Sequence, residues 1–301
     1  MHYKSVKSIL SAQNGMNLFR GCEHGCIYCD SRSKCYRIEH KFDDIEVKEN
    51  AIELLEIALK KKKQKCMIGT GSMTDPYTPS EQFLKHTRRA LELIDKYGFG
   101  ISIITKSNLI FRDLDLLESI NKKAKTVVQV TLTTFNDELC KKIEENVCPT
   151  SERLKILEEM QVRNIPTVVW LCPILPFIND TEENLLSILE QCKKFNVKGI
   201  INFGFGLTLR EGNREYFYQK LEKNFPGKGL FTLYNKYFRD SYECNSPHNE
   251  KLSEIFHQFC GENNIMHNNQ DLLQLQASLS SSFLTKVVLV SSTRSSLLHL
   301  Q

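Results

Sequence analysis

Short apolar runs alternate with amphipathic stretches along most of the chain. The runs are rich in valine and isoleucine, which is typical of parallel strands that are buried on both faces. They lie at 66–72, 100–107, 126–134, 167–175 and 199–208. The stretches between them have apolar residues at helical spacing, as at 50–63, where Ile52, Leu55 and Leu59 share one face.

Two helices have recognisable start signals. Thr78 and Glu81 have the spacing of a capping box, and they predict one helix over 78–98 that ends at Gly98. Asp180 is expected to cap the helix that follows the run at 167–175.

Five or six strand-then-helix units in series predict an α/β fold with a parallel sheet and right-handed crossovers. An open doubly wound sheet and a partial or complete barrel both fit this order. In either fold the functional groups gather at the carboxyl ends of the strands, so the residues that follow each strand are the candidates for chemistry.

Composition narrows the class of protein. The chain has 301 residues, of which 41% are hydrophobic, and 40 basic and 36 acidic residues give a mixed surface of net charge +4. Eleven cysteines, an odd number, do not indicate a disulfide framework in a chain of this length. The chain shows neither an apolar signal region at its start nor an apolar run long enough to cross a membrane, so we expect a cytoplasmic protein.

Three cysteines lie within eight residues. Cys22, Cys26 and Cys29 form a C-x3-C-x2-C pattern that also contains glycines, which let a backbone wrap closely around a ligand. A zinc site would need a fourth ligand, for which Cys35 or His24 is a candidate, and a four-cysteine cluster of an electron carrier could use Cys35. A cubane cluster on three cysteines would instead leave one iron open for a substrate or cofactor.

The loop and the strands after it resemble the radical S-adenosylmethionine (SAM) superfamily, in the branch related to spore photoproduct lyase. The matching segments lie within 14–265, and they read NLFRGCEHGCIYCD, GTGSMTDPYTPSE, ITKSNLIFRDLDLL and PILPFINDTEEN. The resemblance implies a partial (β/α)6 TIM-like barrel with its first strand near residues 5–19. It also implies a [4Fe–4S] cluster on Cys22, Cys26 and Cys29. That cluster would cleave SAM reductively to a 5′-deoxyadenosyl radical, which abstracts hydrogen from substrate.

The resemblance also assigns the contacts with SAM. The loop after the second strand would hold the SAM amino group through Ser72, Thr74 and Asp75. Lys106 would pair with the SAM carboxylate. Further contacts are implied for Thr131 and for the backbone of Tyr28, which would lie near the adenine.

The substrate remains open at this point. Arg153 and Arg210 are candidate cationic partners for a carboxylate or for substrate. Spore photoproduct lyases carry a hydrogen-donating cysteine where this chain has Ser72, so the repair reaction itself does not follow from the resemblance. The leading expectation is a lyase-like enzyme acting on a nucleic-acid lesion or base, supplied with electrons by a reductant such as flavodoxin or ferredoxin.

Two other functions fit the same residues. One is a non-catalytic iron–sulfur or zinc protein in electron transfer or scaffolding, and the other is a radical enzyme that acts on a protein, peptide or small metabolite. We assign 1–265 to the core domain, with the cluster loop at 21–30, and 266–301 to a poorly defined tail in which VVLV at 287–290 is a candidate strand.

Overall fold

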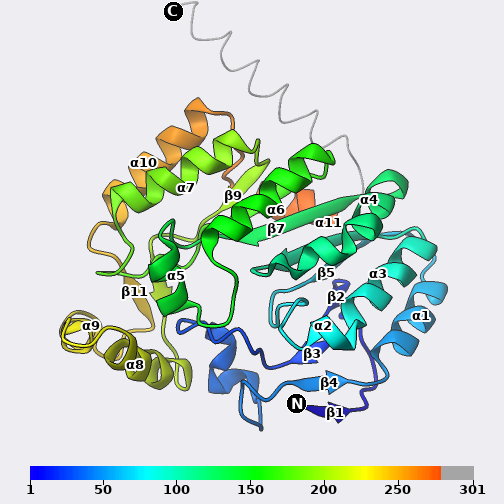
Figure 1. Cartoon of the computed structure of the whole chain (residues 1–301), viewed down its shortest axis with the longest axis horizontal. Helices are drawn as coiled ribbons and strands as arrows, with labels where there is room; N and C mark the ends of the chain where they lie inside the picture. The colour runs from blue at the N-terminus through cyan, green and yellow to red at the C-terminus, as the bar shows by residue number, and fades with distance from the viewer. Residues whose placement is uncertain (279–301) are drawn as a thin grey trace, which may run out of the picture.

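A six-stranded parallel sheet forms the centre of the computed structural model, which describes residues 1–278 (Figure 1). Its strands, in spatial order, are β2 (Gly15–Met16), β5 (Met67–Thr70), β6 (Gly100–Thr105), β7 (Thr126–Thr131), β8 (Thr167–Trp170) and β9 (Gly199–Ile201). Every neighbouring pair is parallel, and β2 and β9 are the two open edges. The predicted partial barrel is therefore confirmed, with a first strand of only two residues.

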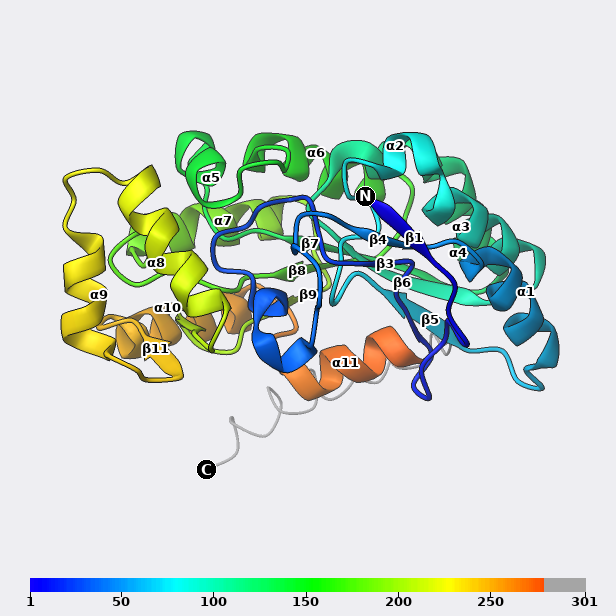
Figure 2. The same cartoon turned by 90° about the horizontal axis from the view of Figure 1, so that it is seen from below.

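Helices cover the outer face of this sheet (Figures 1 and 2). They are α1 (Ala51–Lys61), α3 (His86–Lys96), α4 (Leu114–Lys123), α6 (Thr150–Val162), α7 (Glu182–Lys194) and α10 (Asn249–Glu262). Side chains alternate between the two faces of a strand, so Ile101, Ile103, Val128 and Val130 point outward into the largest apolar core, together with the apolar stripes of these helices.

The inner face of the sheet is layered. Near the start of β5, β7 and β8, Met67, Val127 and Val168 form an apolar layer with Ile201 of β9 and two leucines of α11 (Asn269–Ala277). One step along, Gln129 Nε2 donates to Ser102 Oγ (2.8 Å) and Trp170 Nε1 donates to Gln129 Oε1 (2.5 Å), which gives a polar layer. The carboxyl ends of the strands lie beyond this polar layer, and the candidate active site is built there.

Helix α11 lies across the inner side of the sheet (Figure 2). Its Leu272 and Leu275 are fully buried, and a Cβ at Gly199 would come within 2.2 Å of Leu272 Cδ2. Lys125 Nζ donates to the Leu275 carbonyl (2.6 Å) and fixes the end of the helix. The described part of the predicted tail, 266–278, is thus packed structure, while the candidate strand at 287–290 lies outside the described residues.

Two small sheets flank the barrel. The first has the order β1 (His2–Lys4), β4 (Glu46–Lys48) and β3 (Phe19–Arg20). The second pairs β10 (Gly206–Thr208) antiparallel with β11 (Glu243–Asn245), so the predicted strand at 199–208 is two strands. The remaining elements are η1 (Asp30–Arg32), η2 (Lys34–Tyr36), α2 (Glu81–Leu84), η3 (Asn108–Asp113), α5 (Asp137–Ile143), α8 (Asn213–Asn224) and α9 (Leu230–Phe238).

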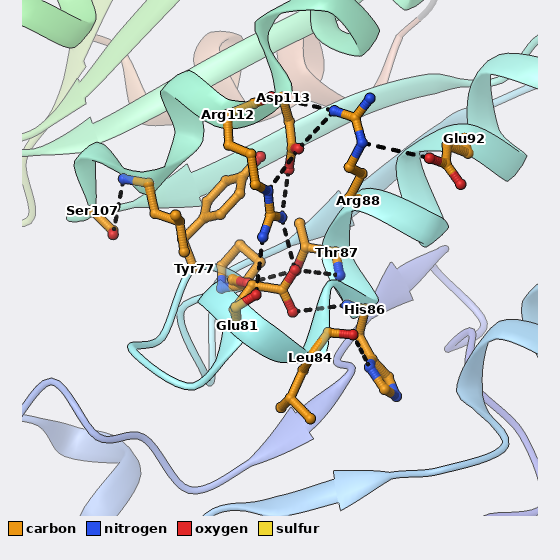
Figure 3. Close-up of polar contacts among 12 residues, drawn as sticks. Tyr77, Glu81, Leu84, His86, Thr87, Arg88, Glu92, Ser107, Arg112 and Asp113 are labelled. Carbon is orange, nitrogen blue, oxygen red and sulfur yellow. Dashed lines mark hydrogen bonds and ion pairs between the residues drawn. The ribbon is translucent and has the colours of Figure 1, made fainter.

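The single helix predicted over 78–98 is wrong, because the chain breaks between α2 and α3. Lys85 at the break is left-handed, with φ of +54°. The Glu81 carboxylate accepts the backbone N–H groups of His86 and Thr87 at 2.9 and 3.0 Å, and Arg112 also donates to it at 2.8 Å (Figure 3). Glu81 therefore caps the second helix rather than forming a box with Thr78.

The predicted cap of α7 is displaced by one residue. Thr181 is the N-cap, and its hydroxyl accepts the N–H of Asn184 (3.2 Å). The carboxylate of Asp180 instead accepts a hydrogen bond from Ser246 Oγ (2.5 Å). Within residues 1–278, no helix has both the length and the apolar character needed to cross a bilayer.

Candidate active site

The three cysteines sit on a tight loop between β3 and η1. Gly21 has φ of +82°, and a Cβ there would come within 2.4 Å of the Phe42 carbonyl, so this turn requires glycine. The Cys22 N–H donates to that same carbonyl (2.9 Å), and Ile27 N–H donates to the Ile143 carbonyl at the end of α5 (2.9 Å). The loop is thus held by backbone contacts on both sides, which leaves its sulfur atoms for a ligand.

The thiols of Cys22 and Cys26 are buried, that of Cys29 is partly exposed, and the three are close enough to influence one another. Burial raises the pKa of Cys22 to about 12, and the neighbouring Cys29 and Asp75 add to the rise. Burial raises the pKa of Cys26 as well, with Lys106 opposing the shift. Thiolates here therefore need a cation to balance them, and a metal or iron–sulfur group supplies that charge. The donor set fits such a group.

A cavity of about 760 Å³ opens beside Cys29 at the carboxyl ends of the strands. Four of the residues expected to contact SAM line it: Tyr28, Ser72, Lys106 and Thr131. They come from the cysteine loop and from the ends of β5, β6 and β7, as the strand-end rule for parallel sheets predicts. The cavity wall thus joins one cysteine of the C-x3-C-x2-C loop, Cys29, to these polar groups.

Thr74 and Asp75 do not line this cavity, because their side chains are used inside the protein. Thr74 Oγ1 donates to the Gly21 carbonyl (2.7 Å), which ties the β5 loop to the cysteine loop. Asp75 accepts from Thr105 Oγ1 (2.8 Å) and from the Lys106 N–H (2.7 Å), and its Oδ2 lies 3.0 Å from His24 Nε2. In this structure both residues position the loops around the cavity.

Asp75 remains ionised despite its burial. Burial by itself raises the pKa of this carboxyl group. The charge of His24 and the backbone donors of Lys106 and Tyr77 outweigh that effect and lower the pKa to about 2.

Lys106 is the cation of the cavity wall. Burial lowers the pKa of its ammonium, but Cys26, Glu144 and Asp75 raise it by more, so the net shift is upward. The side chain therefore carries a full positive charge beside the cavity at neutral pH. A carboxylate or phosphate on a bound ligand is the natural partner of such a group.

Arg153 does not line the cavity, so it is not placed to bind a carboxylate or substrate there, as the sequence analysis had considered. It is fully buried, and it forms an ion pair with the equally buried Glu144. Its other N–H groups donate to the carbonyls of Cys148 and Thr131, each at 3.0 Å. The Tyr28 hydroxyl also donates to Glu144. Arg153 thus connects α6 to the cysteine loop and to the end of β7.

Cys35, the candidate fourth ligand, lies on the exposed surface of η2. Arg210 Nη1 donates to its sulfur (3.3 Å), and Arg210 also donates to the Tyr242 hydroxyl (2.7 Å). The other candidate, His24, is buried and lies against Asp75. Arg210 therefore contacts the rim of the cavity through Tyr242, and it does not line the cavity itself.

Several residues of the cavity wall were not predicted. They are aromatic, amide and thiol side chains from the later part of the barrel and from β11: Trp170, Cys172, Phe203, Tyr242, Asn245 and Asn249. Phe203 is 64% exposed, and its ring centroid lies 6.0 Å from that of Trp170. The strand-end rule could have found Cys172 and Phe203, but nothing in the sequence places β11 beside them.

Comparison with known proteins shows the family to which the chain belongs. The sequence model described as "Radical SAM superfamily" matches residues 16–189. An uncharacterized protein of Methanocaldococcus jannaschii is 31% identical over 220 residues, which span 72% of this chain and 78% of that protein.

Solved structures share the fold. A spore photoproduct lyase variant superposes with a TM-score of 0.60 at 13% identity, over 88% of this chain and 80% of the other. Another variant of that enzyme, with AdoMet and dinucleoside spore photoproduct bound, gives a TM-score of 0.57 at 13% identity, over 84% and 74% of the two chains.

Proposed function

Because this chain belongs to the radical SAM superfamily, we propose that it is an enzyme whose cysteine loop holds a [4Fe–4S] cluster and whose cavity binds SAM. When bound, this pair supplies reductive cleavage of SAM to a 5′-deoxyadenosyl radical that takes a hydrogen atom from substrate. The observation that carries the proposal is the cavity itself, which places Cys29 and the cationic Lys106 in one wall.

The protein's part in this chemistry is to bind, orient and shield. Cys22, Cys26 and Cys29 would hold three irons and leave the fourth open. The Lys106 ammonium would pair with the SAM carboxylate, while the hydroxyls of Ser72 and Thr131 offer further hydrogen bonds. The buried polar contacts of Glu144 and Asp75 would keep these groups fixed.

For the substrate we propose a nucleic-acid lesion or base. Trp170 and the exposed ring of Phe203 offer stacking surfaces on the cavity wall, and bases stack readily on aromatic side chains. The structural relative with dinucleoside spore photoproduct bound supports the same class of substrate. The side chain at 72 is a hydroxyl, so we propose lyase-like chemistry without assigning the lyase's own reaction.

We propose a reducing compartment, the cytoplasm, and a low-potential one-electron donor such as flavodoxin or ferredoxin. All eleven cysteines of the chain are free thiols in the structure, which is typical of proteins kept in a reducing environment.

The test is anaerobic turnover with a matched pair of cysteine variants. The protein is reconstituted with iron and sulfide, given dithionite and SAM, and assayed for 5′-deoxyadenosine by chromatography and mass. We expect product from the parent and from Cys35→Ala, and none from Cys29→Ala. If Cys35→Ala loses as much iron as Cys29→Ala, the cluster has four cysteine ligands and the protein is an electron carrier. A full cluster that binds no SAM would also contradict the proposal.

A further inference from the structure

Three metal-ligating side chains converge on the small sheet at the start of the chain. His2 on β1 is in register with Glu46 on the parallel strand β4, so the two side chains lie next to each other. His40 joins them from the segment that precedes β4. One ligand atom from each of the three lies within 4.8 Å of the other two.

The hydrogen bonds of the two imidazole rings indicate which nitrogen of each neutral ring is free to bind a metal. His40 Nδ1 lies 2.9 Å from the Lys41 carbonyl, which can only accept, so Nδ1 carries the proton and Nε2 of the neutral ring carries a lone pair. His2 Nδ1 lies 3.2 Å from Asp44 Oδ2, and the same reasoning leaves its Nε2 as an acceptor. A second-sphere acceptor on each imidazole is the usual arrangement at metal sites.

The cluster therefore gathers acceptor atoms, and one of them has no partner within the protein. His40 Nε2 is buried and has no hydrogen-bond partner, and Glu46 is only 4% exposed. Lys4 Nζ lies 3.2 Å from Glu46 Oε2, but its side chain is 56% exposed and can turn into solvent. Arg20, which lines the same surface cavity, donates instead to the carbonyls of Tyr36 and Arg37.

We propose that His2, His40 and Glu46 bind a divalent transition metal of the zinc type, through the two Nε2 atoms and the carboxylate. Two imidazoles and one carboxylate are a common zinc donor set, and water would complete the coordination. The three residues line a surface cavity of about 470 Å³, which gives the ion and its water access. The inference does not depend on the proposed radical chemistry.

The position of this site suggests what the ion does. The His40 ring lies against Gly21, where a Cβ would be 3.3 Å from His40 Cε1. Two residues further on, the Phe42 carbonyl receives the N–H of Cys22. A metal that joins β1, β4 and His40 would therefore fix the segment on which the cysteine loop rests.

The test uses the full chain with its cysteines already loaded with iron and sulfide, and zinc as the probe. Zinc affinity is measured by competition with a chromophoric chelator, at matched iron content, in the parent, His40→Gln, Glu46→Gln and Lys4→Gln. His257→Gln is the control, because His257 is exposed on α10 and also has a histidine neighbour, with 5.2 Å between the rings. X-ray absorption at the zinc edge then identifies the donor atoms.

We expect one zinc per chain in the parent and the control, and at least about tenfold weaker binding in His40→Gln and Glu46→Gln. Lys4→Gln should bind zinc about twofold to fivefold more tightly, because it removes the ion pair that competes for Glu46. This gain cannot come from misfolding. The absorption spectrum should show nitrogen and oxygen donors near 2.0–2.1 Å.

Two results would contradict the proposed metal site. One is equal zinc affinity in the parent and His40→Gln. The other is a sulfur shell near 2.3 Å in the absorption spectrum, which would place the zinc in the cysteine loop.

Discussion

The two ends of the barrel's inner face are built on opposite principles. At the start of the strands, α11 fills the space with Leu272 and Leu275, and Gly199 lets the helix approach to contact distance. At the other end, the same strands leave a cavity of about 760 Å³ whose wall carries a thiol and a charged lysine. Ser102, Gln129 and Trp170 form the polar layer between them.

On the same strands, the residues that stabilise the fold lie at one end and the residues that would bind a ligand lie at the other. Val127, Gln129 and Thr131 alternate onto the inner face of β7, and they pass from the apolar layer through the polar layer to the cavity within five residues. Substitutions at the α11 end should therefore change the free energy of unfolding and leave ligand binding intact. Substitutions in the cavity wall should weaken ligand binding and leave the free energy of unfolding nearly unchanged.

The largest effect is expected from the apolar end. Leu272→Ala should lower the free energy of unfolding by about 3 kcal/mol, because it leaves a cavity beneath α11. Leu273→Ala on the same helix, where the side chain is 49% exposed, should cost less than about 0.5 kcal/mol. Anaerobic urea unfolding measures both. The comparison of the two ends fails if Leu272→Ala also lowers the iron content per folded chain.

A second effect concerns the charge buried beneath the cavity. Asp75 has its pKa lowered from 3.8 to about 2, so its stabilising contribution is complete above pH 4 and is lost as the pH falls toward 2. The difference corresponds to about 2 kcal/mol. As the pH falls, the free energy of unfolding of the cluster-free protein should therefore drop by about 2 kcal/mol less in Asp75→Asn than in the parent. Identical acid profiles would show that Asp75 is not held ionised.

The smallest effect should appear in binding alone. Lys106→Met should weaken SAM binding to the cluster-loaded protein about tenfold, or 1.4 kcal/mol, because it removes the cation from the cavity wall. Iron content should not change. Lys61→Met, on the exposed end of α1, serves as the control, and equilibrium dialysis gives the affinities. Unchanged affinity in Lys106→Met would mean that the SAM carboxylate binds elsewhere.

The sequence predicted what depends on local spacing. The cysteine loop, the order of strands and the place of Lys106 at the end of β6 all follow from patterns within a few residues. The predictions over 78–98 and at Asp180 failed for a related reason. Glu81 and Asp180 found partners outside their own turns, in Arg112 and Ser246, and such contacts leave no trace in a local pattern.

The site was harder to predict than the fold. Thr74 and Asp75 have the right place in the chain for ligand contacts, but they hydrogen-bond to the protein's own loops. Arg153 was a candidate partner for a carboxylate or for substrate, and it is instead a buried partner of Glu144. Tyr242 reaches the cavity through the β10–β11 pair, which is formed by segments more than thirty residues apart in the sequence.

The position of Trp170 makes ligand binding measurable by fluorescence. It is the single tryptophan of the chain, and it stands in the cavity wall with its indole hydrogen-bonded to Gln129. The tryptophan fluorescence of the protein therefore originates at the place where a ligand would bind. Filling the cavity changes the surroundings of the emitting ring, so occupancy of the cavity can be followed as an optical signal without attaching a dye.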